Sequence, residues 1–194
     1  LPETPPLNLG SFDIVINPNA TLAANSAALA AFNRAAQAWE ARISDPITVS
    51  ISAGLSALGA GIIGSTSSVT LQAGYSTIRN ALVADAALDT GDAITASMPT
   101  AAQFSAFVPI GRSLSGNLLG TKANLKAMGF TGLDGSFGAN DATINFSTTF
   151  SFDYDNSNGV TAGFMDFETV AIHEIGHALG FVSIVDSVNA GMTS

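Results

Sequence analysis

The sequence predicts an α+β fold in which strands and helices share one core. Three observations point to it. Apolar and polar residues alternate over 12–17, apolar residues recur every three or four positions over 26–43, and a second helical period runs over 166–179. The chain has 194 residues, of which 47% are hydrophobic and 11% charged, enough apolar material for one sizeable core.

The first half of the chain alternates between strands and helices. Residues 12–17 read as a strand, and a long helix over 26–43 carries its apolar side chains on one face. Asn25 or Ser26 can cap the start of that helix, and Pro46 follows its end because proline cannot continue a helix. A second strand is predicted over 47–51, where β-branched residues alternate, and a third over 68–72.

The second half begins with a helix predicted over 75–87 and ends with the helix over 166–179. Between them lie short helical pieces near 100–107 and 122–128, separated by glycine-rich turns, and a strand over 142–152. We expect residues 1–11 to form an extended, proline-rich arm and residues 12–194 to form a single domain.

The charge balance excludes some classes of partner. Six Lys and Arg stand against 15 Asp and Glu, a net charge of −9. Binding to nucleic acid needs a basic surface that neutralises phosphates, and docking on anionic membranes needs the same sign of charge. We therefore expect neither partner. Cysteine is absent, which removes disulfides and thiolate metal ligands.

The last predicted helix contains His173-Glu174-Ile175-Gly176-His177. Residues four apart share one face of a helix, so both imidazoles can reach one zinc ion. Glu174 cannot bind the same ion from its adjacent position, but it can take a proton from a zinc-activated water and later give it to a leaving amine. This is the chemistry of peptide-bond hydrolysis, with a protein or peptide as substrate.

The motif is specific because His173 and His177 are the only histidines of the chain. Two randomly placed histidines would fall four apart about one time in a hundred, before the glutamate between them is required. The alternatives are an amphipathic helix with solvated or hydrogen-bonded histidines, and a structural zinc site. A closed zinc site usually needs four strong protein ligands, and this chain has no cysteine to supply them.

The segment from His173 to Phe181, with Gly180 three residues after His177, resembles the active-site signature of the zincin metallopeptidases in their metzincin-like form, HExxHxxG. The surrounding residues resemble secreted bacterial zinc metalloproteases. The resemblance implies a mixed twisted sheet with a long backing helix and an active-site helix, a secreted, extracellular bacterial protein, and a catalytic domain over 12–194.

The chain departs from that signature at the third metal ligand. The resemblance implies His or Asp six residues after His177, where this chain has Ser183, a neutral hydroxyl and a poor zinc ligand. Asp186 is the remaining candidate within the chain, and a solvated loop carboxylate is the alternative. Only 17 residues follow His177, so we expect the C-terminal subdomain to be incomplete, with Gly191-Met192-Thr193 as a weak candidate for a methionine turn.

Two further features carry hypotheses. Asp153, Asp155 and Asn158 are oxygen donors that can hold Ca²⁺, although their spacing breaks the EF-hand pattern and an ordinary turn is the alternative. The resemblance also implies an edge strand that pairs with an extended substrate, and the strand over 142–152 is the candidate, with a core strand as the alternative.

A second function stays open beside the peptidase: a secreted binding or surface protein that keeps the fold without a competent metal site. Ser183 favours it, and Glu174 argues against it. The composition, rich in Ala, Gly, Ser, Thr and Asn, is typical of many secreted bacterial proteins. The chain does not begin with a signal segment, so we expect one to have been removed or the chain to have been trimmed. No feature of the sequence indicates an oligomeric state.

Overall fold

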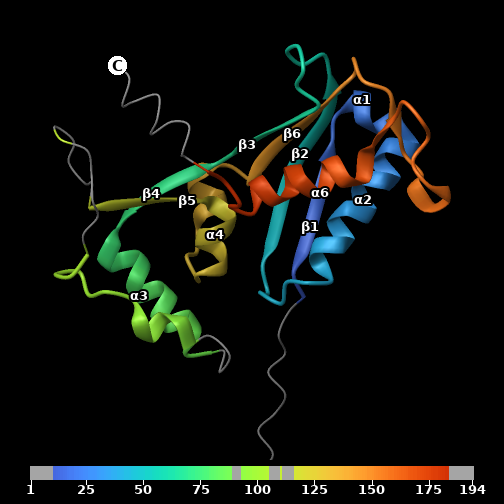
Figure 1. Cartoon of the computed structure of the whole chain (residues 1–194). Coiled ribbons are helices and arrows are strands. Elements are labelled where there is room, and N and C mark those ends of the chain that lie inside the picture. Colours follow the sequence, from blue (N-terminus) through green and yellow to red (C-terminus); the bar gives the residue numbers. More distant parts are fainter. Residues whose placement is uncertain (1–10, 89–92, 105–109, 111–115, 184–194) are drawn as a thin grey trace, which may run out of the picture.

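A mixed four-stranded sheet carries two long helices on one face (Figure 1). The structure, a computed structural model, describes residues 11–88, 93–104, 110 and 116–183. Its strands are β1 (Asp13–Pro18), β2 (Thr48–Ser56), β3 (Gly64–Ser68), β4 (Thr70–Gly74), β5 (Asn117–Thr121), β6 (Ala142–Ser147), β7 (Phe152–Asp153) and β8 (Met165–Asp166). Its helices are α1 (Ala20–Ala23), α2 (Ser26–Glu40), α3 (Tyr75–Ala86), α4 (Lys122–Ala127), α5 (Leu133–Phe137) and α6 (Phe167–Ala178), with short 3-10 turns η1 (Ala93–Ser97) and η2 (Asn156–Asn158).

The sheet has the order β1-β2-β6-β3. β1 and β6 run parallel to β2, whereas β3 runs antiparallel to β6 and forms the edge. The mixed α+β architecture predicted from the sequence is therefore confirmed.

Helices α2 and α6 cover the same face of this sheet. The ring of Phe146 on β6 lies 5.2 Å from that of Phe32 on α2 and 4.4 Å from that of Phe167 on α6. All three phenylalanines are fully buried, so each removes a large apolar surface from water and together they fix α6 on the sheet. This packing places one face of α6 beside the edge strand β3.

A single residue, Val69, separates β3 from β4. Its N–H donates to the Asp141 carbonyl at the start of β6, and its carbonyl accepts from the N–H of Lys122 at the end of β5. The N–H and carbonyl of one strand residue point to the same side, so β6 and β5 lie on the same edge of the continuous segment 64–74. Along its opposite edge this segment pairs with no other strand of the described residues.

Several predicted elements agree with the structure. The helices over 75–87, 122–128 and 166–179 correspond to α3, α4 and α6, and the strands over 12–17 and 47–51 to β1 and β2. Asn25 caps α2 by accepting from the N–H of Ala28. That helix ends at Glu40 rather than near 43, because Ala41 and Arg42 already form a turn closed on Gln37 and Trp39.

Two predicted strands were wrong in extent. The strand predicted over 68–72 is divided at Val69 between two sheets, and the one over 142–152 ends at Ser147 and resumes only as the two-residue β7. β6 is also not the edge strand, since it pairs with β2 on one side and β3 on the other. The predicted helical piece over 100–107 is a turn as far as Gln103, and the arm over 1–11, apart from Ser11, lies outside the described residues.

Candidate metal centre

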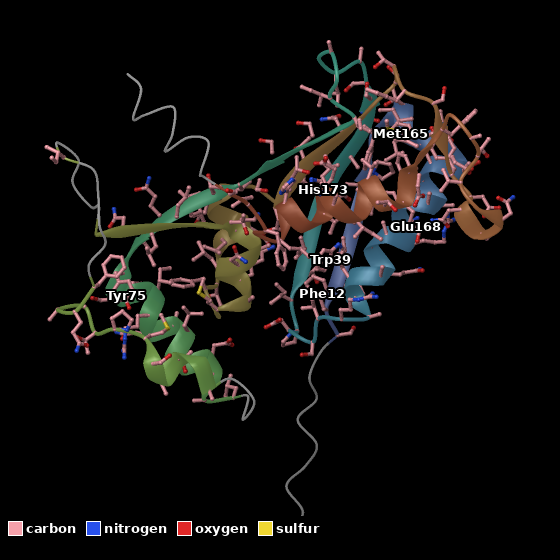
Figure 2. The ribbon with its side chains drawn as sticks, in the orientation of Figure 1. Phe12, Trp39, Tyr75, Met165, Glu168 and His173 are labelled. Atoms are coloured by element: carbon pink, nitrogen blue, oxygen red, sulfur yellow. The ribbon has the colours of Figure 1, made fainter. Side chains whose placement is uncertain are left out.

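The two histidines converge on one point beside the edge strand. His173 and His177 project from one face of α6, and their Nε2 atoms lie 2.9 Å apart with the rings nearly perpendicular. His173 is exposed and His177 half-buried. Figure 2 shows His173 on α6 and Trp39 on the neighbouring helix α2.

The separation of the two nitrogens fits a shared metal ion. A zinc–nitrogen bond is about 2.0–2.1 Å long and zinc sites are tetrahedral, so two nitrogens on one ion lie about 3.3 Å apart, close to the 2.9 Å found here. The same 2.9 Å also suits an N–H···N hydrogen bond between neutral imidazoles, which is the alternative that the sequence left open. Either way, both Nε2 atoms face the same small volume.

A backbone contact fixes which nitrogen of His177 is available. Nδ1 of His177 lies 2.6 Å from the carbonyl oxygen of Phe181, and only a protonated Nδ1 can donate to a carbonyl. The neutral ring then has an unprotonated Nε2 facing His173. Metal-binding histidines in proteins commonly have this outer hydrogen bond to a carbonyl, which holds both the tautomer and the ring orientation.

Glu174 lies beside the histidines and is held by the edge strand. It is only 6% exposed, and the hydroxyl of Thr66 on β3 donates to its Oε2 at 2.6 Å. A Cβ atom at Gly64 would lie 2.6 Å from Oε1, so the glycine leaves the space that the carboxylate occupies. The hydrogen bond offsets part of the cost of burying a charge.

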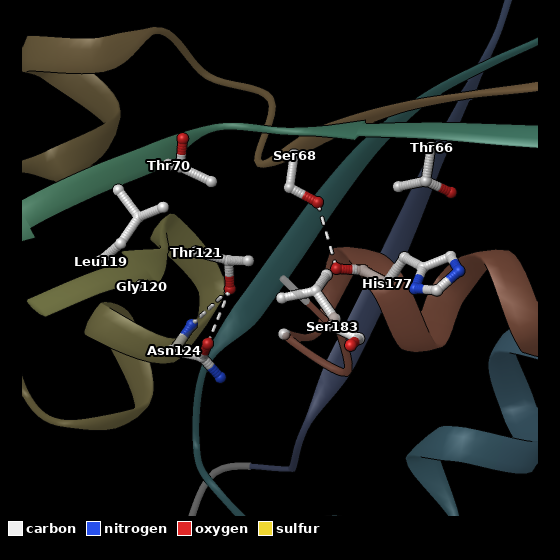
Figure 3. Close-up of a pocket in the computed structure, with 11 residues that line it drawn as sticks. Thr66, Ser68, Thr70, Leu119, Gly120, Thr121, Asn124, His177 and Ser183 are labelled. Atoms are coloured by element: carbon white, nitrogen blue, oxygen red, sulfur yellow. Dashed lines mark hydrogen bonds between the residues drawn. The ribbon is translucent and has the colours of Figure 1, made fainter. Parts of the chain in front are cut away.

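A second hydroxyl fastens α6 to β3. Ser68 donates to the backbone oxygen of His177 at 3.1 Å, and Thr66 lies 2.9 Å from that of Glu174. Thr66 and Ser68 stand two residues apart, so both point to the same face of the strand (Figure 3). Neither residue was predicted from the sequence. The only local pattern that could have indicated them is the hydroxyl side chain at every second position, Thr66, Ser68 and Thr70. Such patterns are common in ordinary strands.

Two hollows flank the histidine pair. One of about 380 Å³ lies between His177, the strands β3 to β5 and the residues that follow α6; its lining includes Thr66, Ser68, Leu119, Asn124 and Ser183 (Figure 3). The other, of about 410 Å³, is lined by His173, Glu174, Thr169, Val170 and residues 61–64. An extended ligand crossing the histidines would therefore find space on both sides.

Among the described residues, no third candidate ligand is brought to the histidine pair. Within the part of the chain that the structure describes, no group of three or more His, Cys, Asp or Glu side chains is placed to hold an ion. Ser183 lines the same hollow as His177. Asp186 and the candidate methionine turn 191–193 lie outside the described residues. Glu168 faces away from the pair and forms an ion pair of 2.9 Å with Arg34.

The acidic loop after β7 is organised by its own hydrogen bonds. Hydrogen bonds from the Thr161 hydroxyl, and from the N–H groups of Asp155 and Thr161, hold the pKa of Asp153 below its usual value. The Ser157 hydroxyl and N–H lower the pKa of Asp155 in the same way. These contacts are those of an ordinary turn, and Ca²⁺ binding by Asp153, Asp155 and Asn158 stays a prediction. Asp166 caps α6 by accepting from the N–H of Glu168.

Among the described residues, no helix is long and apolar enough to cross a membrane. In comparisons with known proteins, no protein-family model matches the chain, no curated protein matches its sequence, and no solved structure matches its fold.

Proposed function

We propose that the protein is a secreted, zinc-dependent endopeptidase with a zincin-like fold. The observation that carries the proposal is the 2.9 Å approach of the His173 and His177 Nε2 atoms, with the carboxylate of Glu174 one residue away on the same helix. A pair of ligands and a neighbouring base are the parts that metal-assisted hydrolysis requires.

His173 and His177 would hold the ion, with Asp186 as the third ligand in this proposal. When bound, zinc would supply Lewis acidity: it would polarise the carbonyl of the substrate and lower the pKa of a bound water towards about 7. The tautomer of His177 supports this assignment, because the proton on Nδ1 leaves the Nε2 lone pair for a metal.

Glu174 moves the proton. Its carboxylate accepts one proton from the attacking water as the oxygen–carbon bond forms, and it delivers that proton to the amine nitrogen as the carbon–nitrogen bond breaks. The products are a carboxylic acid and an amine, and Glu174 is regenerated. Thr66 holds one oxygen of the carboxylate during both transfers.

The edge of β3 that pairs with no described strand is the proposed binding site of the substrate backbone. Ser147 donates to Ile63 and Val69 donates to Asp141, so in this antiparallel ladder the backbone groups of residues 63, 65, 67 and 69 face β6. Those of Gly64, Thr66 and Ser68 face outward, where an extended peptide can pair with them. The hollows on both sides of the histidines favour cleavage within a chain over removal of a terminal residue.

The test combines zinc content with cleavage. We expect close to one zinc per chain by metal mass spectrometry after dialysis against a weak chelator, and cleavage of an unfolded protein such as reduced casein. Glu174→Gln is expected to keep the zinc and to lower kcat/KM at least about a hundredfold, since positioned acid–base groups contribute on the order of 10²–10⁴.

Glu168→Gln is the matched control, because it makes the same chemical change on the same helix at a carboxylate that pairs with Arg34. It is expected to cleave like the wild type. Undiminished cleavage by Glu174→Gln would contradict the mechanism. A chain that holds no zinc and cleaves nothing would instead favour the binding or surface protein.

A further inference from the structure

The chain that leaves α6 is held by a side chain from a different part of the fold. Asn124 on α4 donates from Nδ2 to the Leu179 carbonyl at 2.8 Å. The Thr121 hydroxyl donates to Oδ1 of the same amide at 3.0 Å (Figure 3). The NH₂ end is thereby left for the Leu179 carbonyl. The amide is therefore held at both ends.

Asn124 also packs against the turn itself. Gly180 has φ +102°, a conformation that favours glycine, and a Cβ atom there would lie 2.1 Å from Oδ1 of Asn124. The turn closes through two backbone bonds, from Gly180 N–H to His177 and from Phe181 N–H to Gly176. The turn reverses the chain and so places the Phe181 carbonyl oxygen 2.6 Å from Nδ1 of His177.

Trp39 supports the same turn from the opposite side. Its ring centroid lies 5.5 Å from that of Phe181, and its Nε1–H donates to the Ile172 carbonyl at 3.0 Å. The indole ring also lies close to Gly176, where a Cβ atom would be 3.4 Å from it, an ordinary contact distance. Phe181 is thus fixed by a turn that α4 holds and by a ring that α2 supplies.

We propose that Asn124 is a positioning residue for His177. It holds the Leu179–Gly180 turn, the turn places the Phe181 carbonyl, and the carbonyl keeps the ring proton on Nδ1 so that Nε2 presents a lone pair. The effect on zinc binding rests on the proposed function. The effect on the tautomer of His177 rests only on the contacts described above. Loss of an outer partner of a metal-binding histidine typically weakens metal binding about 10–100-fold.

The test uses two variants. Asn124→Ala removes the amide. Asn124→Leu also removes it but keeps the approximate volume of the side chain, and it serves if the alanine variant folds poorly. Asn25→Ala is the control. It removes an asparagine that caps the N-terminus of α2 by accepting from the Ala28 N–H, far from the histidines. In metal-free protein at fixed alkaline pH, long-range ¹H–¹⁵N spectra report which ring nitrogen of His177 carries the proton.

We expect Nδ1–H in the wild type and in Asn25→Ala, and a mixture of tautomers in both Asn124 variants. Competition with a chelating dye is expected to show roughly tenfold weaker Zn²⁺ binding in the Asn124 variants only. A proton that stays on Nδ1 in both Asn124 variants overturns the inference, whatever the zinc affinity. If the tautomer changes but the wild type binds no Zn²⁺, the inference stands and the proposed function fails.

Discussion

The hydroxyl of Thr66 lies 2.6 Å from Oε2 of Glu174, although 108 residues separate the two in the chain. The contact joins the edge strand β3 to α6 at the carboxylate to which the proposed mechanism assigns the proton transfers. Removing the hydroxyl would leave that buried oxygen without its donor and free the side chain to turn away from the histidines.

We expect Thr66→Val to lower kcat about 10- to 100-fold with little change in KM, since a hydrogen bond to a charged group contributes about 1.5–3 kcal/mol and 1.4 kcal/mol corresponds to a factor of ten. Steady-state kinetics on a fluorogenic peptide measure both constants. Ser68→Ala is the matched control, because its hydroxyl donates to the His177 backbone and not to Glu174. Equal losses in the two variants would show that β3 packing, rather than the carboxylate contact, is responsible.

Gly180→Ala is expected to destabilise the protein through two separable effects. The left-handed φ of +102° costs roughly 1–3 kcal/mol for a residue with a Cβ, and the new Cβ collides with Asn124. Gly163→Ala isolates the first effect, because Gly163 has φ +84° with open space around it. Urea unfolding measures both variants. A Gly180→Ala loss no larger than that of Gly163→Ala would mean that Asn124 moves aside without cost.

Lys122 is a buried cation beside the fully buried carboxylate of Asp141, whose other oxygen contacts Lys126 at 2.9 Å. Its Nζ lies 3.4 Å from Asp141 Oδ1, an oxygen with no other partner in the described structure, and 2.8 Å from Asp134. Lys122→Met is expected to lower the free energy of unfolding by about 3–5 kcal/mol, the usual cost of breaking a buried pair. Lys126→Met should cost less, because that lysine is partly exposed. Chemical denaturation that finds the reverse order would contradict this account.

The same cluster predicts how stability depends on pH. Hydrogen bonds from Lys122 and Lys126 hold the pKa of Asp134 below 3.8, so its contribution is present above that value and is lost as the pH falls through the lowered pKa. Burial lowers the pKa of Lys126, but hydrogen bonds to Asp134 and Asp141 outweigh it and raise the pKa above 10.5. That contribution is lost only as the pH rises through the raised value.

We therefore expect Asp134→Asn to be less stable than the wild type across neutral pH, with the difference closing in strong acid. Thermal unfolding of both proteins over a pH series measures it. A difference that stays constant down to the acid limit would show that the carboxylate makes no pH-dependent contribution.

Asp186→Asn is expected to weaken zinc binding about a hundredfold or more, because a neutral amide replaces a carboxylate ligand. Chelator competition measures the affinity. Asp155→Asn is the control, since its carboxylate accepts hydrogen bonds within its own loop. Wild-type affinity in Asp186→Asn would remove this residue from the ligand set.

The parts of the fold that follow from local pattern could be predicted, and those that depend on distant pairing could not. The apolar periodicities of α2, α3 and α6 are visible in the sequence because each helix buries one face. The division at Val69 is not visible, because it is decided by which strands, β6 or β5, reach the segment from elsewhere in the chain. For the same reason, the edge position of β3 could not be predicted.

The candidate site likewise has residues that could be predicted from local sequence and residues that could not. His173, Glu174 and His177 lie within about one helical turn, so their spacing alone is enough to predict a metal site. Asn124 reaches the end of α6 from 55 residues away, and Thr66 and Ser68 from more than 100. None of these three has a local signal that separates it from an ordinary strand or helix residue.

The open edge over 64–74 also has a consequence for how copies of the chain behave in solution. Exposed strand edges are commonly protected from pairing with each other by charged residues or proline, and this segment, Gly-Ser-Thr-Ser-Ser-Val-Thr-Leu-Gln-Ala-Gly, has neither. The net charge of −9 then provides the main repulsion between copies. Because dissolved salt screens that repulsion, concentrated protein should self-associate more readily as the ionic strength rises, and more dilute buffers should keep it monodisperse.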